Sequence, residues 1–138
     1  MINKTLINDI FQLFKNKKYD EVILEIEKNF DINKIPPDLI NLSAISKLLK
    51  SNNTKEDIFS ALNDLENYYK KSQKKFQKIE AVCNYISTCI INCRKYNEIV
   101  EYLIKAEKLY EKCSKEIGYD EKLYSRGVDL YKYTLAVS

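Results

Sequence analysis

The chain has 138 residues, of which 45% are hydrophobic and 31% are charged, with a net charge of +3 and only two Gly and two Pro. This composition is typical of a globular chain of about one domain, and the scarcity of Gly and Pro favours long helices over a β-protein with many turns. No run of eighteen apolar residues occurs, and the first fifteen residues do not resemble a secretory signal. We therefore expect no membrane span and a cytoplasmic location.

Apolar residues recur three and four positions apart along almost the whole chain, which predicts amphipathic helices and no strands. Pro36 and Pro37 suit the first turn of a new helix. Thr54 and Asp57 have the spacing of a capping box, and Gly118 is a typical helix stop. Because the links are short, we expect successive helices to be antiparallel. Seven helices are predicted, at about residues 3–16, 19–30, 37–50, 54–71, 74–93, 95–117 and 119–136.

Two segments of the sequence nearly repeat each other, KKYDEVILEIEK at residues 17–28 and RKYNEIVEYLIK at residues 94–105. Each places a Tyr after a basic pair and a Glu in the first turn of an amphipathic helix, where the helix dipole favours negative charge. Apolar residues at matching positions are expected to face the preceding helix. A repeated helical hairpin of this kind is the sequence signature of an α-solenoid.

These hairpins resemble the tetratricopeptide repeat family, whose unit is a pair of antiparallel helices. In the best copy, residues 81–106, the family positions are held by Cys83, Ile86, Ser87, Ile90, Ile99, Leu103 and Ala106. Gly127 matches a first-helix position in the last helix. The resemblance implies one all-α domain over residues 1–138, a right-handed α-solenoid of about three antiparallel helical hairpins closed by a capping helix. The hairpins are expected at about residues 3–30, 37–71 and 74–117, and the cap at about 119–136. An irregular helical bundle is the alternative architecture.

The sequence offers little for catalysis. It has no His, the commonest general base and a common metal ligand, and Gly118 and Gly127 form no phosphate-binding loop. Cys89 and Cys93 have the spacing of half a metal site, but Cys113 is expected far from Cys93 along the hairpin. We therefore expect four reduced thiols in apolar surroundings, and no enzyme activity, cofactor or metal.

By its resemblance to the family, the chain is expected to be a noncatalytic interaction module or scaffold. A peptide or protein partner would bind on the concave face that the first helices of the hairpins form. An Asn side chain there can both donate to and accept from a peptide backbone, and a Lys can bind a carboxylate. The open ends of a short stack would also allow a homo-oligomer. The solvent-facing groups on this face would be Asn8, Asn41, Lys47, Asn84, Tyr85, Thr88, Tyr124 and Lys132.

Two other functions stay open from the sequence. Repeats of this type resemble those that precede glycosyltransferase and other transferase domains, so the chain would be the amino-terminal noncatalytic part of a larger enzyme if the reading frame continued past Ser138. The segment KKSQKKFQK at residues 70–78 has five Lys and one Phe, and would bind RNA or an acidic partner. Because Lys is abundant along the whole chain, a Lys-rich link is the simpler explanation, and nucleic acid is not the expected partner.

Overall fold

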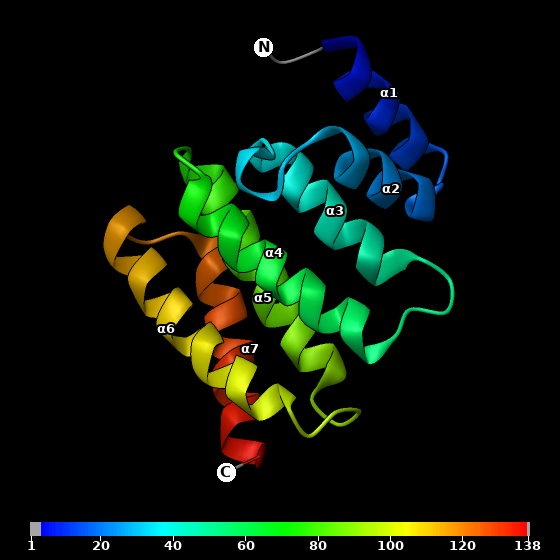
Figure 1. The fold of residues 1–138 in the computed structure, drawn as a ribbon. Coiled ribbons are helices and arrows are strands. Elements are labelled where there is room, and N and C mark those ends of the chain that lie inside the picture. The colour runs from blue at the N-terminus through cyan, green and yellow to red at the C-terminus, as the bar shows by residue number, and fades with distance from the viewer. Residues whose placement is uncertain (1–3, 138) are drawn as a thin grey trace. The chain divides into compact units, whose positions relative to one another are not determined.

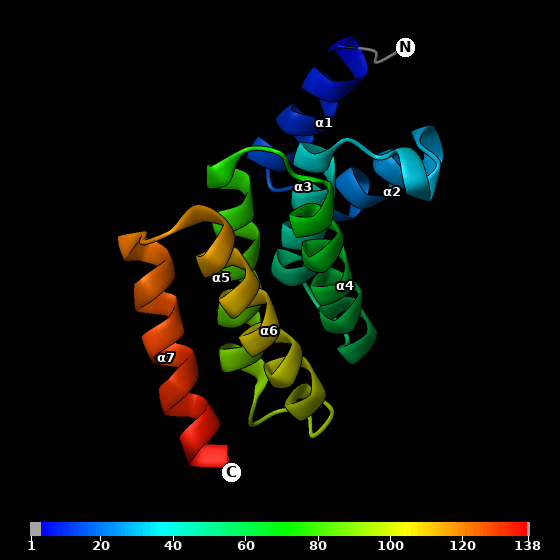
Figure 2. The ribbon, with the colours of Figure 1, turned by 90° about the vertical axis from the view of Figure 1, so that its left-hand side faces the viewer.

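The computed structural model describes the backbone of residues 4–137 and the side chains of residues 4–134. Over these residues the chain is all-helical, with seven α-helices, one 3-10 turn and no strand (Figures 1 and 2). The predicted class and number of helices are therefore confirmed. The elements are α1 (Lys4–Lys15), α2 (Tyr19–Asn29), η1 (Ile32–Lys34), α3 (Pro37–Leu49), α4 (Lys55–Lys71), α5 (Lys75–Asn92), α6 (Ile99–Ile117) and α7 (Glu121–Val137).

The chain divides into two compact units, Met1–Asn67 and Tyr68–Ser138, and the division falls within α4. The expected start of the first helix at residue 3 lies outside the described residues. Each described helix is too short or too polar to cross a membrane. The expected single domain and its hairpins stay predictions.

In the first unit, α2 contacts both α1 and α3. Its core is formed by the apolar stripes of these three helices, and burying each Ile or Leu side chain contributes about 1.5–3 kcal/mol to stability. The Phe14 ring lies edge-on to Tyr19, with 5.6 Å between the ring centroids, and fixes the turn between α1 and α2. The buried core residues are Ile10, Val22, Ile26, Leu39 and Leu42.

The start of α4 carries the predicted capping box. The Asp57 carboxylate accepts hydrogen bonds from the Thr54 backbone N–H at 2.8 Å and from its hydroxyl at 3.1 Å, and the Asp57 N–H donates back to Thr54 Oγ1 at 3.2 Å. The Lys50 ammonium lies 3.3 Å from the same carboxylate. Partial burial raises the pKa of Asp57, but the hydrogen bonds from Thr54 and Lys50 outweigh it, so the pKa is lowered overall.

In the second unit, α5 contacts both α6 and α7, and α6 also contacts α7 (Figure 2). Because α5 packs against two helices, a wide part of its surface is buried, and its buried positions extend beyond one narrow stripe. Fully buried apolar side chains come from all three helices, among them Val82, Ile86, Ile99, Leu103 and Leu123.

The two copies of the repeated segment begin their helices differently. Tyr19 is the first residue of α2, whereas Tyr96 lies in a turn and α6 begins at Ile99, later than expected. The Ile99 N–H bonds to the Tyr96 carbonyl at 3.2 Å, and the Val100 N–H bonds to the Asn97 carbonyl at 3.3 Å. Backbone hydrogen bonds between residues three apart are typical of a 3-10 turn. This 3-10 turn stands in place of the first turn that was expected for α6.

Two aromatic residues within the predicted helices are exposed. Phe76 in α5 is 61% exposed and Tyr131 in α7 is 66% exposed, whereas the polar Gln77 is buried in the first turn of α5. The helical period fixes which residues share a face, but it does not fix how far along the helix the neighbouring helices extend. Both rings are therefore available on the surface.

Candidate functional site

The eight residues expected on a binding face belong to different units. Those in the first unit are Asn8, Asn41 and Lys47, and those in the second are Asn84, Tyr85, Thr88, Tyr124 and Lys132.

In the first unit, Lys47 is engaged within the fold. Its ammonium on α3 donates to Asp64 Oδ2 at 2.7 Å and to Ser60 Oγ at 2.9 Å, both on α4. Burial raises the pKa of Asp64, although the neighbouring Lys47 opposes this. Asn8 is exposed on α1, and Asn41 is half-buried on α3. A partner carboxylate would have to displace Asp64 to reach Lys47.

In the second unit, Tyr85 and Thr88 are buried, where the sequence suggested that they face solvent. The cause is the double packing of α5 against α6 and α7. Thr88 Oγ1 donates to the Asn84 carbonyl at 2.7 Å and the Thr88 carbonyl accepts from Asn92 Nδ2 at 2.8 Å, which satisfies these polar groups inside the helix. Asn84 itself is half-buried.

The last two expected residues, Tyr124 and Lys132, are exposed on α7. The Tyr124 ring lies 5.9 Å from that of Tyr119, centroid to centroid, at a tilt of 49°. Of the eight residues, Thr88 and Asn84 are joined by the hydrogen bond within α5 described above. The role of the eight residues in binding stays a prediction.

A groove lies between α6 and α7 in the second unit. It has a volume of about 360 Å³, and its described lining holds two phenol rings, two carboxylates and no Lys or Arg. Leu130 is buried at its floor, Tyr110 is half-buried, and Tyr131 stands exposed at its edge. Thr134 Oγ1 donates to the Leu130 carbonyl at 2.9 Å, so this hydroxyl is bonded within α7. The lining residues are Glu107, Tyr110, Glu111, Gly127, Leu130, Tyr131 and Thr134.

Sequence reasoning missed this groove, although a signal was present. On α6 the lining positions are spaced by three and four residues, and those on α7 follow the same spacing from Gly127 onward, so each set forms one stripe of its helix. Gly127 leaves room for the Tyr110 ring in its present position, since a β-carbon there would overlap the ring. A glycine within a predicted helix was the visible sign of this close approach.

Glu116, near the end of α6, joins two residues from other helices. Its Oε1 accepts from the Tyr69 hydroxyl at 2.9 Å, and its Oε2 accepts from the Lys78 ammonium at 2.9 Å. The hydrogen bonds from Lys78 and Tyr69 lower the pKa of Glu116. Burial, followed by the bond to Glu116, raises the pKa of the Tyr69 phenol. The Lys78 ammonium also lies 4.7 Å from the centroid of the Tyr69 ring, which makes this a structural cluster.

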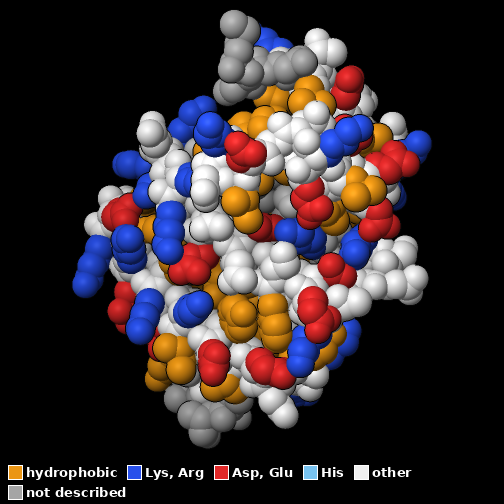
Figure 3. Space-filling view, in the orientation of Figure 1, with side chains coloured by type: hydrophobic (Ala, Val, Ile, Leu, Met, Phe, Trp, Pro, Cys, Tyr) orange, Lys and Arg blue, Asp and Glu red, His pale blue; other side chains and the backbone are white. Residues whose placement is uncertain are grey.

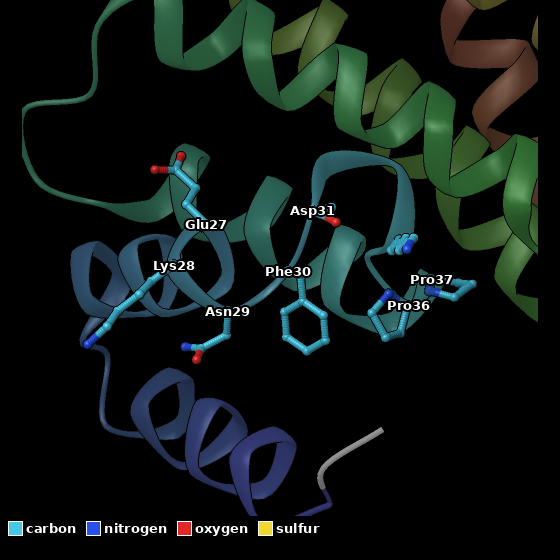
Figure 4. Close-up of a pocket in the computed structure, with 8 residues that line it drawn as sticks. Glu27, Lys28, Asn29, Phe30, Asp31, Pro36 and Pro37 are labelled. Carbon is cyan, nitrogen blue, oxygen red and sulfur yellow. The ribbon is translucent and has the colours of Figure 1, made fainter. Parts of the chain in front are cut away.

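A second hollow lies in the first unit, where α2 ends and α3 begins (Figure 4). It has a volume of about 560 Å³ and is formed by Phe30, Pro36, Pro37 and mostly exposed polar side chains. Its two carboxylates, Glu27 and Asp31, are balanced by two Lys, so the hollow favours neither cations nor anions. We assign no ligand to it.

The four cysteines are free thiols, and three of them are buried. Burial raises the pKa of Cys83, that of Cys89 to about 12 and that of Cys113 to about 11, so these thiols are protonated and poor nucleophiles at neutral pH. Cys93 is half-buried at the end of α5. Over the described residues, no group of three or more Cys, Asp or Glu side chains is arranged to hold a metal ion.

Comparison with known protein families, characterised proteins and solved structures found no match for this chain. What it can bind therefore has to follow from its own side chains. The groove between α6 and α7 combines a concave shape, two aromatic rings and charged side chains that are all negative among its described lining. It is therefore the strongest candidate for a binding site.

Proposed function

We propose that the chain is a noncatalytic helical-repeat module of the tetratricopeptide type, which binds a segment of a protein or peptide partner. Support comes from the packing of the second unit, where α7 contacts both α5 and α6, as expected of a helix that covers the open face of a hairpin. In the first unit α2 likewise contacts the helices before and after it.

The partner segment binds in the groove between α6 and α7. Tyr110 and Tyr131 supply large contact areas at a low cost in side-chain entropy, and Leu130 supplies an apolar floor. A volume of about 360 Å³ lies in the range of small-ligand pockets and suits one or two side chains of an extended peptide.

The charge of the groove selects the partner. Glu107 and Glu111 lie one turn apart on α6 and both line the groove. A Lys or Arg side chain of the partner would pair with these carboxylates while its aliphatic part and cationic head pack against the tyrosine rings. The observation that carries the proposal is therefore the combination of two tyrosines and two glutamates around a hollow whose described lining has no cation.

Selection from a displayed library of random peptides tests the proposal. The wild-type chain is expected to enrich sequences with a Lys or Arg next to an apolar residue, and Tyr131→Ala is expected to lose this enrichment. Tyr119→Ala is the matched control, because Tyr119 is 79% exposed and does not line the groove. Failure to enrich any peptide, or enrichment of acidic peptides, would overturn the proposal.

A further inference from the structure

The positive charge of the chain is concentrated in its second unit. Residues 68–138 contain 14 Lys and Arg against 9 Asp and Glu, whereas residues 1–67 contain 9 against 11. Figure 3 shows Lys and Arg side chains gathered over α6 and near the junction of α4 with α5. Residues 70–78 at this junction contain five Lys and no acidic residue. Such a surface attracts polyanions.

The positions of two of these lysines are accounted for by the dipole of the helix in which they lie. Lys70 and Lys71 occupy the last turn of α4, where a cation is stabilised by the negative end of the helix dipole. Lys78 is accounted for by its ion pair with Glu116 at 2.9 Å. These three residues therefore have structural roles whether or not a ligand binds.

Lys74 and Lys75 have no such explanation. Lys74 is the N-cap of α5 and Lys75 is its first residue, both are exposed, and the first turn of α5 contains no acidic residue. Cations are unfavourable at the positive end of a helix dipole, where an anion is stabilised instead. The two lysines therefore form a positively charged surface at the start of α5 that would attract a phosphate.

An exposed aromatic ring lies next to these lysines. Phe76 follows Lys75 directly and is 61% exposed, and the Lys74 ammonium lies 5.8 Å from the centroid of its ring. An acidic peptide would use the lysines but would gain little from a phenyl face. A nucleobase would stack on that face while its phosphates contact the lysines.

We propose that the α4–α5 junction binds single-stranded nucleic acid, with phosphates at Lys74 and Lys75 and a base stacked on Phe76. This surface is distinct from the groove between α6 and α7, and the proposal does not depend on the proposed function of that groove. Exposed bases are required for stacking, so a duplex of the same length is expected to bind less tightly than a single strand.

The test measures the fluorescence anisotropy of a labelled twelve-nucleotide oligouridine RNA as a function of salt. With about four phosphates neutralised, the logarithm of the association constant is expected to fall with the logarithm of salt concentration with a slope of about −3. Lys74→Ala with Lys75→Ala should reduce this slope by about half. Phe76→Ala should weaken binding about tenfold and leave the slope unchanged, since stacking releases no counterions.

Lys28→Ala with Lys34→Ala is the matched control, because it removes the same charge from exposed positions in the first unit. Its affinity for the RNA should stay close to that of the wild type. Equal loss of affinity in the two double variants, equal affinity for duplex and single strand, or preferential binding of a polyglutamate peptide would each overturn the proposal.

Discussion

The phenol ring of Tyr110 on α6 occupies the space beside Gly127 on α7 where a β-carbon would otherwise lie. Both residues line the groove proposed as the peptide site. The Tyr110 ring can lie this close to the α7 backbone because position 127 has no side chain, so the position of the ring and the shape of the groove depend on the same contact.

A double-mutant cycle tests this contact. Replacing Gly by Ala within a helix gains about 1 kcal/mol of helix propensity, so Gly127→Ala should stabilise a chain in which the Tyr110 ring has been removed. In the wild type the new methyl group must displace the ring, and we expect no net gain or a loss. Urea unfolding of the wild type, the single variants Gly127→Ala and Tyr110→Ala, and the double variant measures the difference. The same effect of Gly127→Ala in both backgrounds would show that the ring does not restrict this position.

The Lys47–Asp64 pair should make stability depend on pH. At pH 7, Lys47→Met should lower the free energy of unfolding by about 2 kcal/mol, less than for a fully buried pair because the Lys47 and Asp64 side chains keep exposures of 13% and 24%. Burial already raises the pKa of Asp64, and loss of the cation raises it further. Because the pKa of Asp64 is higher in the folded state than in the unfolded state, the free energy of unfolding falls as pH rises above the unfolded-state pKa. The loss caused by Lys47→Met should therefore be smaller at pH 4 than at pH 7.

Urea unfolding at the two pH values measures this effect. The added change Asp64→Asn removes the titrating group, and the double variant should show the same deficit at both pH values. A deficit in Lys47→Met that does not change with pH would contradict the assignment.

The helices of this protein could be predicted from the sequence because the apolar period and the capping residues are local features. The Thr54–Asp57 capping box was predicted for that reason. The pairing of Lys47 with Asp64 joins two helices, and the burial of Tyr85 depends on which helices pack around α5. Local patterns place such residues on a face of a helix, but tertiary packing decides what covers that face.

The hydrogen bonds of Glu116 should stabilise the fold at neutral pH, and this stabilisation should be lost at acidic pH. Bonds from Lys78 and Tyr69 lower the pKa of Glu116, so their contribution is complete above its ordinary value of 4.5 and is lost as pH falls through the lowered value. The free energy of unfolding of the wild type should therefore rise more steeply between pH 3 and pH 5 than that of Glu116→Gln. Parallel pH profiles for the two proteins would show that the carboxylate is not coupled to folding.

The thiols should differ in reactivity. At pH 7.5 a thiol reagent should modify Cys93 in the native protein, because this side chain is only half-buried. Cys83, Cys89 and Cys113 should react only after unfolding, because burial keeps them from the reagent and raises their pKa values. Cys93→Ser should abolish the fast phase. A fast phase that survives in Cys93→Ser would mean that a second thiol is accessible.

The central claim is that the groove between α6 and α7 binds a cationic peptide segment. It is tested most directly by anisotropy titration of a Lys- or Arg-containing peptide enriched by the wild-type chain. We expect Tyr131→Ala to raise the Kd at least tenfold, Glu107→Gln with Glu111→Gln to weaken binding and reduce its salt dependence, and Tyr119→Ala to leave the Kd unchanged. Equal Kd values for the wild type and Tyr131→Ala would place the peptide elsewhere and contradict the account.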